Sequence, residues 1–299
     1  MKKKVVGLGE VLWDILPDRT CLGGAPANFA YITTLMGDQG IVASRVGQDF
    51  QGIEALRRLE ELGLDIDHVQ TDPEHPTGTV KVALDGNGQA QFEIAQSVAW
   101  DFLEWSPDWN RIAESADAVC FGSLAQRSEK SRATVRQFLS AMPDSAVKVF
   151  DVNLRQSYYS AELLSESMRL ADIVKLNDEE LPAIMNLYGL AHTDEKSSAQ
   201  RLLAAYGLQL VCITRGSRGS LLVRSGDFSE HTGFRVRVVD TVGSGDAFTA
   251  GLVHEYLHGA PLDLVNEVAN LVGAWVASEV GAMPTPKRGA LEHSLAEIR

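Results

Sequence analysis

The sequence has few cysteines, an excess of acidic over basic residues, and no long hydrophobic run. Its 299 residues include only 3 cysteines, at positions 21, 120 and 212, which are too scattered for a disulfide framework and predict a reducing, cytoplasmic environment. The 27 Lys and Arg against 40 Asp and Glu give a net charge of −13, which argues against binding to nucleic acid or to an anionic membrane. No apolar run reaches the roughly 18 residues that a membrane span needs.

Several common signatures are also absent. No Gly-x-x-x-x-Gly-Lys-Ser/Thr sequence is present, which excludes a P-loop enzyme, and the protein-kinase motifs are missing. The pair Gly7 and Gly9 lacks the third glycine of a dinucleotide-binding fingerprint, so NAD binding has little support. Three lysines at positions 2–4 imitate a signal peptide, but Glu10 and Asp14 interrupt the apolar stretch, so we expect none.

Apolar runs alternate with helical patterns along most of the chain. Strands are predicted at residues 5–8, 41–46, 118–121, 147–150, 172–176, 208–213 and 220–224, with a strand-like segment at 235–239. Helices are predicted from Pro26 to the cap at Gly37, near 53–62, and at 129–141, 161–170, 195–206, 245–258 and 262–280. This alternation predicts an α/β fold with a parallel sheet covered by helices.

Residues 79–94 have a different pattern. Apolar and polar residues alternate on both sides of an Asp-Gly-Asn-Gly turn at 85–88, which predicts a β-hairpin with one apolar face. Such a hairpin either covers a site or a partner, or extends one edge of the main sheet. One main domain with a small β insertion fits this organisation better than two equal domains.

The strongest functional pattern is Asp-Thr-Val-Gly-Ser-Gly-Asp at 240–246, followed by an apolar helical pattern. A glycine-rich turn at a helix N-terminus presents unpaired N–H groups and partial positive charge, which suits a phosphate. Asp246 in the first helical turn could accept a proton from an attacking hydroxyl. Together these features describe phosphoryl transfer to an alcohol, although Ser, Gly and Asp also occur at helix starts for capping alone.

Two long motifs now make the chain resemble the ribokinase-like, or PfkB-type, carbohydrate kinases. The first is Gly-Gly-Ala-Pro-Ala-Asn-Phe-Ala at 23–30, with Gly37 and Gly47 at the family's spacing, and the second is the segment 240–251. The resemblance covers essentially the whole chain. It implies a three-layer α/β/α Rossmann-like core in one domain, 1–299, with a small β lid from about 12–20 and 77–100. It further implies ATP as donor and a sugar hydroxyl as acceptor.

Roles on the acceptor side follow from the resemblance. Asp246 matches the catalytic base, and the matching anion hole comprises Gly243, Ser244 and Gly245. The implied sugar-binding residues are Asp14, Gly23, Gly24, Asn28 and Arg155. Carboxylate and amide groups suit hydroxyls, and glycines let a polar ligand reach the backbone. Without the family context, Asp14 is equally a solvated strand-end charge and Asn28 a helix-start residue.

The nucleotide side has weaker local signals. Polar residues follow several predicted strands, where ligands bind in open α/β sheets. By resemblance the nucleotide-binding residues are Asn153, Asn177, Thr214, Gly216, Gly219 and Asn270. The resemblance also assigns Glu180 to a magnesium site, partly through water, because hard oxygen ligands suit Mg²⁺. Taken alone, the run 178–180 is favourable charge in a first helical turn, and 214–219 is a polar turn.

The resemblance leaves the acceptor and the assembly open. The first motif is most similar to the fructokinase branch, but the stretch 91–96 lacks a Phe-x-Phe-Tyr-Arg-like pattern of many fructokinases. 2-Keto-3-deoxygluconate, ribose or a nucleoside therefore remain alternatives. The family suggests a monovalent cation such as K⁺ near Asp240 and Val242. The apolar face of the lid suggests a homodimer.

Two interpretations from other classes need separate tests. His254-Glu255-Tyr256-Leu257-His258 spells the His-Glu-x-x-His pattern of zinc hydrolases, with Glu279 as a possible third ligand. However, the same helix begins at the proposed anion hole, and a histidine near a helix C-terminus is favoured without any metal. Stoichiometric zinc in the purified protein would favour the hydrolase. A non-catalytic sugar-binding relative is disfavoured because Asp246 and the glycines around it are intact.

Overall fold

The main sheet of the computed structural model is mixed rather than wholly parallel. The structure describes residues 2–84, 90–189 and 193–285. The sheet runs in the order β13-β12-β11-β10-β9-β8-β1-β4-β5. From one edge these strands are β13 (Asp227–His231), β12 (Ser220–Arg224), β11 (Leu210–Thr214), β10 (Ile173–Asn177), β9 (Val147–Asp151), β8 (Ala118–Gly122), β1 (Lys4–Leu8), β4 (Gln39–Gly47) and β5 (Val69–Asp72).

The prediction of a parallel sheet is correct for the strands from β5 to β11. It is wrong at the edge formed by β12 and β13. There β12 pairs antiparallel with both β11 and β13. The reason is local: only the short 3₁₀ turn η3 (Gly216–Arg218) links β11 to β12, and a connection this short can join only antiparallel neighbours. A helix-containing crossover would have been needed to keep them parallel.

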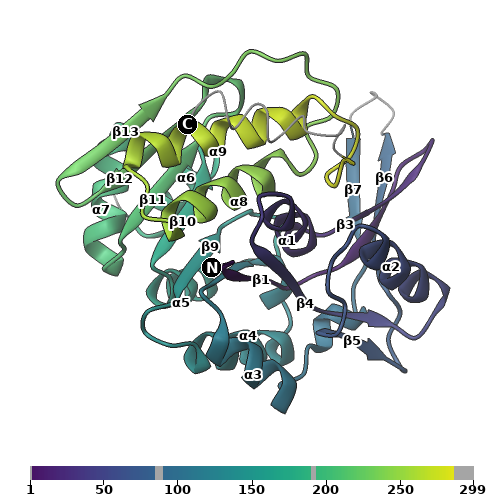
Figure 1. The fold of residues 1–299 in the computed structure, drawn as a ribbon. Helices are drawn as coiled ribbons and strands as arrows, with labels where there is room; N and C mark the ends of the chain where they lie inside the picture. The colour runs from purple at the N-terminus through teal and green to yellow at the C-terminus, as the bar shows by residue number, and fades with distance from the viewer. Residues whose placement is uncertain (1, 85–89, 190–192, 286–299) are drawn as a thin grey trace.

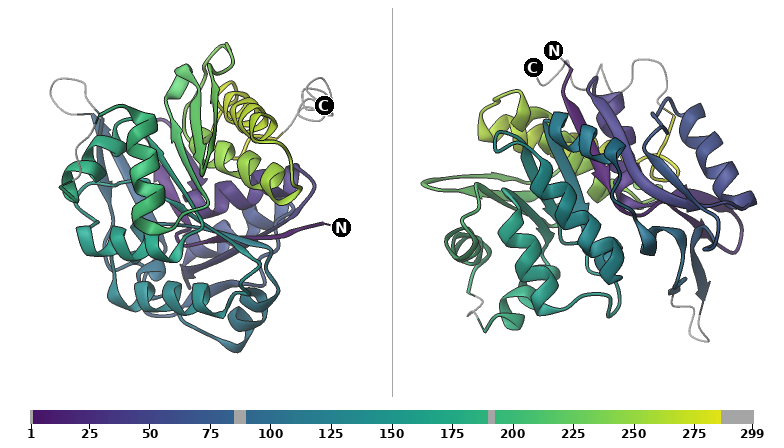
Figure 2. Two further views of the ribbon diagram at one scale, coloured as in Figure 1. Left: turned by 90° about the vertical axis from the view of Figure 1, so that its left-hand side faces the viewer. Right: turned by 90° about the horizontal axis from the view of Figure 1, so that it is seen from below.

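Helices cover both faces of the sheet, as the left view of Figure 2 shows. One face carries α3 (Pro107–Ser115), α4 (Glu129–Ala141), α5 (Ala161–Leu170), α6 (Glu180–Leu187) and α7 (Glu195–Tyr206). The other carries α1 (Ala25–Leu35), α2 (Phe50–Glu61), α8 (Ser244–Leu257) and α9 (Leu262–Ala277). Successive strand residues face opposite layers, so Val5 joins one core and Val6 the other. This is the expected three-layer α/β/α core.

A second, four-stranded sheet lies beside the main body (Figure 1). Its order is β3 (Thr20–Gly23), β2 (Leu12–Ile15), β6 (Gly78–Leu84) and β7 (Ala90–Ile94). The predicted hairpin is therefore present as β6 and β7, while its turn at 85–88 lies outside the described residues. Because β6 pairs with β2, the alternative of an extension to the main sheet is wrong.

Residues 235–239 do not form the predicted strand. They pair with no described strand, and Val236, Val238 and Val239 are 40%, 56% and 53% exposed. The backbone N–H of Val239 instead donates to the carbonyl of Ala277, at the end of α9, at 2.9 Å. All of residues 235–239 are exposed, so this segment has no buried face to pack in a sheet.

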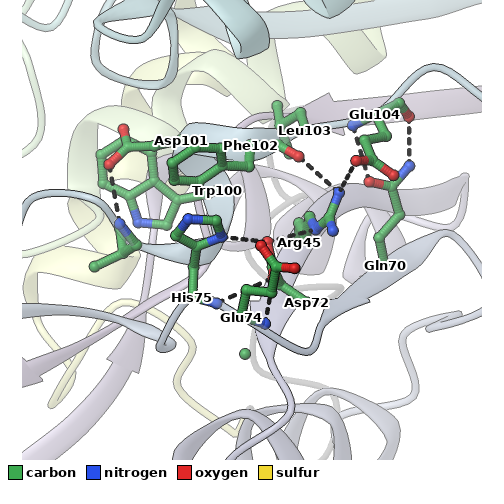
Figure 3. Close-up of polar contacts among 12 residues, drawn as sticks. Arg45, Gln70, Asp72, Glu74, His75, Trp100, Asp101, Phe102, Leu103 and Glu104 are labelled. Atoms are coloured by element: carbon green, nitrogen blue, oxygen red, sulfur yellow. Dashed lines mark hydrogen bonds and ion pairs between the residues drawn. The ribbon is translucent and has the colours of Figure 1, made fainter.

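A buried ionic network joins the β5 edge of the main sheet to the 3₁₀ helix η1 (Ala99–Phe102), as Figure 3 shows. The Arg45 guanidinium lies 3.0 Å from the Asp72 carboxylate and donates to the Phe102 carbonyl at 2.7 Å. His75 contacts the same carboxylate at 3.0 Å and stacks on Phe102. Each buried charge has an opposite partner, so the network fixes the loop from which β6 enters the small sheet.

Two expectations from composition can be compared with the structure. The three cysteines are unpaired, as their spacing predicts, with Cys120 and Cys212 buried and Cys21 partly exposed. Across the described part of the chain, none of the helices combines the length and apolarity needed to cross a bilayer. The division into one domain with a lid stays a prediction.

Candidate active site

Two helix N-termini bring Asp246 and Asn28 together. The Asn28 side-chain amide, on α1, donates to Asp246 Oδ2, in the first turn of α8, at 2.8 Å. Gly243 caps α8 with φ 77°, and a Cβ there would lie 2.3 Å from the Cβ of Ala282. Glycine is therefore required at this cap for both its conformation and its size. Asn28 and Asp246 are 218 positions apart in the sequence. Their hydrogen bond shows that the two sequence motifs meet in one site.

The N-terminus of α8 has the geometry expected of an anion site. The first N–H groups of a helix lack intrahelical partners and carry partial positive charge. Ser244 differs from its neighbours because its backbone N–H and its hydroxyl both donate to the Thr241 carbonyl, at 3.2 and 2.9 Å. The predicted roles of Gly243 and Gly245 suit this geometry, whereas Ser244 in this conformation mainly closes the turn.

A buried lysine lies beneath this helix start. Lys175, on β10, places its ammonium 3.1 Å from both carboxylate oxygens of Asp151, on β9. Thr249, one turn into α8, also donates to Asp151 at 3.1 Å. A Cβ built on Gly245 would lie 3.2 Å from the Lys175 ammonium, so this cation sits directly behind the anion site. Burial lowers the pKa of Lys175, but Asp151 and Glu180 outweigh it and raise the pKa above its ordinary value, which keeps the lysine charged.

The electrostatics of the site suit a proton acceptor. Burial by the surrounding protein, followed by the charge of Asp151, raises the pKa of Asp246 from 3.8 to about 6. The hydrogen bond from Asn28 and the charges of Lys175 and Arg155 oppose this rise. At neutral pH Asp246 is therefore ionised, but more basic than an ordinary aspartate, which suits general-base catalysis.

Glu10 is a site residue that the sequence did not identify. It follows β1, is only 5% exposed, and lines the same pocket as Asp246. Among the described residues, its Oε2 has no hydrogen-bond partner. Burial, and to a smaller extent the charge of Asp246, raise the pKa of Glu10 from 4.5 to about 7. A carboxyl with an unmatched buried oxygen inside a pocket is a polar contact available to a ligand.

Replacing Glu10 with glutamine should flatten the pH dependence of stability. Because the folded-state pKa lies above the ordinary value, protonated Glu10 favours the fold, and stability is lost as the pH rises from 4.5 to about 7. That shift corresponds to about 3 kcal/mol. Glu10→Gln cannot ionise, so thermal unfolding at pH 5 and pH 8 should differ less than in the parent protein. Exposed Glu60→Gln is the control, and an unchanged pH dependence in Glu10→Gln would contradict the assignment.

The small sheet supplies the predicted Asp14. This residue lies on β2 opposite Cys21 of β3, and a Cβ on neighbouring Gly23 would lie 2.6 Å from its carboxylate. The pKa of Asp14 is raised to about 6, mainly by burial. The charge of Arg155 opposes this rise, and the charge of Asp240 adds to it. Gly24 has φ 109°, and a Cβ there would lie 2.3 Å from the Glu10 carbonyl. Gly24 is therefore sterically required where β3 passes into α1, whereas a side chain at Gly23 would displace the Asp14 carboxylate.

The loop after β9 carries Asn153 and Arg155. Asn153 lines the pocket and has the unusual φ of 39° for a residue other than glycine. Arg155 is exposed, and its charge lowers the pKa values of Glu10, Asp14 and Asp246. A cation that influences all three carboxyls lies near the acceptor side of the site. The pocket is lined by Glu10, Ala25, Pro26, Phe29, Cys120, Phe121, Gly122, Ser123, Leu124, Asp151, Asn153, Asp246 and Thr249.

Asn177 and Glu180 form a compact cap at the start of α6. Asn177 Oδ1 accepts the N–H of Glu180 at 2.7 Å, and Glu180 accepts the N–H groups of Asn177 and Leu154 at 2.9 and 2.8 Å. Burial raises the pKa of Glu180. These contacts are those of a helix N-terminus, so the magnesium role of Glu180 and the nucleotide role of Asn177 stay predictions.

The predicted nucleotide loop follows β11. Thr214 ends the strand, and Gly216 and Gly219 both have positive φ, at 56° and 80°. A Cβ on Gly219 would lie 1.9 Å from the His231 carbonyl, so the loop needs glycine to pass β13. Asn270, on α9, donates to Ser220 at 2.7 Å and to two oxygens of Asn266. Its amide nitrogen therefore joins α9 to β12, and its contact with adenine stays a prediction.

The His-Glu-x-x-His motif lies at the other end of α8. The carboxylate near its two histidines is Asp38, from the turn between α1 and β4. The prediction of Glu279 as third ligand is therefore wrong. A helix rises about 1.5 Å per residue, so His254 lies about 12 Å along α8 from Asp246. The histidines do not line the pocket, which argues against the zinc-hydrolase interpretation.

The comparison with known families decides the identity. Residues 19–288 match the model of the pfkB family carbohydrate kinases, so the match spans most of the chain. The chain belongs to the pfkB family. The resemblance carried by the two sequence motifs is thus confirmed.

Curated relatives and solved structures agree with this membership. A fructokinase of Salmonella typhimurium is 31% identical over 309 residues, covering 97% of this chain and 96% of the relative. A putative sugar kinase of Pyrococcus horikoshii is 31% identical over 278 residues, covering 90% and 84%. The ATP complex of an uncharacterised sugar kinase from that organism has a TM-score of 0.83 at 29% identity, covering 99% of this chain and 100% of the other. A Vibrio cholerae fructokinase with fructose, ADP and calcium has a TM-score of 0.81 at 28% identity, covering 99% of both chains.

The pfkB membership establishes the reaction class. The protein is an ATP-dependent sugar kinase with a ribokinase-like α/β fold. This result argues against the zinc hydrolase and against the non-catalytic relative.

Proposed function

We propose that this pfkB kinase is a fructokinase, which transfers the γ-phosphoryl group of ATP to a hydroxyl of fructose. The observation that carries the catalytic part is the position of Asp246. It lies in the first turn of α8, held by Asn28, beside a glycine-rich helix start with Lys175 behind it. Two relatives at 31% and 32% identity are named fructokinases, which supports fructose as the acceptor.

In the proposed reaction, the Asp246 carboxylate takes the proton from the attacking hydroxyl. The hydroxyl oxygen forms a bond to the γ-phosphorus, the bond to the bridging oxygen breaks, and ADP leaves. Charge on the transferred group is held by the N–H groups of Gly243 and Gly245 at the positive end of α8, because the N–H of Ser244 already donates to the Thr241 carbonyl. Asp14, Asn28 and the backbone at Gly23 and Gly24 bind the remaining sugar hydroxyls.

The side chains near the nucleotide end suit Mg²⁺ held through water. Each carboxylate oxygen of Glu180 accepts one N–H, which leaves a second lone pair for a water ligand, whereas the Asn177 amide oxygen already accepts the N–H groups of Glu179 and Glu180. When bound, Mg²⁺ would neutralise phosphate charge. A monovalent cation fits less well, because the Asp240 carboxylate near Val242 already pairs with Arg19 at 2.9 Å. A K⁺ ion there would compete with this guanidinium, so we assign it no step.

We propose that the small sheet acts as a lid that keeps water from the phosphoryl group. Arg19, between β2 and β3, pairs with Asp240 ahead of α8 and connects the lid to the catalytic segment. The homodimer has weaker support. Val80 and Ile94, on the hairpin, pack in the chain's own core and are only 7% and 6% exposed. The burial of these two side chains therefore needs no second subunit.

An acidic sugar such as 2-keto-3-deoxygluconate is a second candidate, and Arg155 is the observation that favours it. This exposed cation lies close enough to Glu10, Asp14 and Asp246 to lower their pKa values. A guanidinium at the acceptor end could bind the carboxylate of such a sugar. Fructose has no carboxylate, so loss of Arg155 should weaken acidic sugars selectively.

The deciding experiment measures ADP release with ATP and Mg²⁺ against a panel of acceptors. The panel contains fructose, ribose, 2-keto-3-deoxygluconate, glucose, tagatose and adenosine, with Asp246→Asn as the inactive control. We expect the highest kcat/KM with fructose. A preference of more than roughly 10-fold for 2-keto-3-deoxygluconate, reduced in Arg155→Ala, would replace fructose by the acidic sugar.

A further inference from the structure

Three potential metal ligands meet at the C-terminal end of α8. Asp38, His254 and His258 each offer one ligand atom, and these atoms lie within 4.8 Å of one another. The Asp38 carboxylate lies 2.7 Å from His254 Nδ1 and 3.9 Å from His258 Nε2. The two histidines are four residues apart and therefore share one face of the helix.

We propose that Asp38, His254 and His258 bind one divalent ion of the zinc class, at a site separate from the kinase pocket. Two imidazoles and one carboxylate, with water as a fourth ligand, form a common tetrahedral zinc set. The ion would replace the proton shared by His254 and Asp38 and release it to solvent. Imidazole ligands select zinc-class ions over Mg²⁺, so the nucleotide's metal should not compete here.

The surroundings orient the ligands. His258 Nδ1 lies 2.7 Å from the His254 carbonyl, so an Nδ1–H donor leaves the Nε2 lone pair to bind metal. The Lys3 backbone N–H donates to Asp38 Oδ1 at 3.0 Å, and the Lys3 ammonium pairs with Asp117 rather than facing the site. The negative end of the helix dipole adds attraction for a cation.

Burial and access are both suitable. The Asp38 and His254 side chains are 3% and 10% exposed, whereas His258 is 40% exposed and offers a route for the ion. The ion would connect the turn after α1 to the end of α8. The other ends of these two helices meet through Asn28 and Asp246, so zinc would fix the pair at both ends.

This site differs from the hydrolase that the motif first suggested. The carboxylate ligand is Asp38, which is 216 positions from His254 in the sequence. Zinc in the purified protein would therefore not by itself indicate hydrolysis. Kinase activity and zinc binding are separate properties, and either can fail in an experiment without the other.

The test is a titration of tag-free, chelator-treated protein with Zn²⁺ in buffer without phosphate or nucleotide. We expect one equivalent to bind, with a rise in Tm, and Co²⁺ to give the absorption bands of a tetrahedral site. His258→Ala should weaken Zn²⁺ binding by more than ~10-fold. Excess Mg²⁺ should not displace the ion.

Two further variants make the result specific. Asp38→Asn retains the size of the side chain and should also weaken binding. His68→Ala is the matched control, because His68 pairs with Asp108 at 2.5 Å but belongs to no group of three ligands among the described residues. Absence of one-equivalent binding, or equal affinity in His258→Ala and the parent protein, would overturn the proposal.

Discussion

Replacing Asp246 with asparagine is expected to lower kcat by at least roughly 10²-fold while the protein still folds. The substitution preserves the shape of the side chain. The new asparagine oxygen can still accept the hydrogen bond from the Asn28 amide, which in the parent protein joins Asn28 to Asp246 at 2.8 Å. It removes the basic lone pair that takes the proton from the acceptor hydroxyl. ADP release under saturating sugar and ATP measures the effect, and circular dichroism checks the fold.

The control for this variant is Asp263→Asn. Asp263 also lies in the first turn of a helix, α9, but it does not line the pocket. Its substitution should leave kcat unchanged. Turnover of Asp246→Asn within a few-fold of the parent protein would exclude Asp246 as the base.

The pH profile of the parent enzyme provides a second readout of the same prediction. The pKa of Asp246 is raised to about 6, and only the ionised form can accept a proton. The value of kcat/KM should therefore fall as the pH decreases through about 6, and remain high above it. Asp246→Asn should lose this acid limb, since its remaining activity does not depend on that carboxyl.

Local patterns predicted most of the core elements because each depends on nearby residues. The helix that starts at Pro26 and the glycine cap of α8 are examples in which chain conformation is set within a few positions. The unrecognised elements have mixed local signals. Strand β13 is largely polar, Asp-Phe-Ser-Glu-His, and α6 contains a proline in its first turns. Their structure depends on packing against distant strands and helices.

The site was predictable where one motif holds several functional residues together. Asp246 and its glycines stand within one turn, so the sequence alone indicated an anion site. Glu10 and Lys175 were missed because their neighbours come from other strands. One signal was present for Lys175: a lysine within the otherwise apolar strand Ile-Val-Lys-Leu must have a buried partner. The identity of that partner, Asp151, required the order of the sheet.

Replacing Lys175 with methionine is expected to destabilise the protein by about 3–5 kcal/mol. Lys175 is 7% exposed and is bound to both oxygens of Asp151, itself 4% exposed. Methionine fills similar space but leaves the Asp151 carboxylate buried without its cation. Urea unfolding measures the loss, and ligand-free protein avoids stabilisation by nucleotide.

A double variant separates this electrostatic cause from poor packing. Asp151→Asn with Lys175→Met removes both charges, so most of the stability lost in Lys175→Met should return. Kinase activity should not return, because the double variant still lacks the Lys175 ammonium. That ammonium lies behind Gly245, 3.2 Å from the position of a Cβ built there, and stabilises negative charge at the start of α8. If the double variant lost the sum of the two single effects, the pair would not be coupled. If it regained full kcat, Lys175 would be a structural ion-pair partner with no influence on the transferred phosphoryl group.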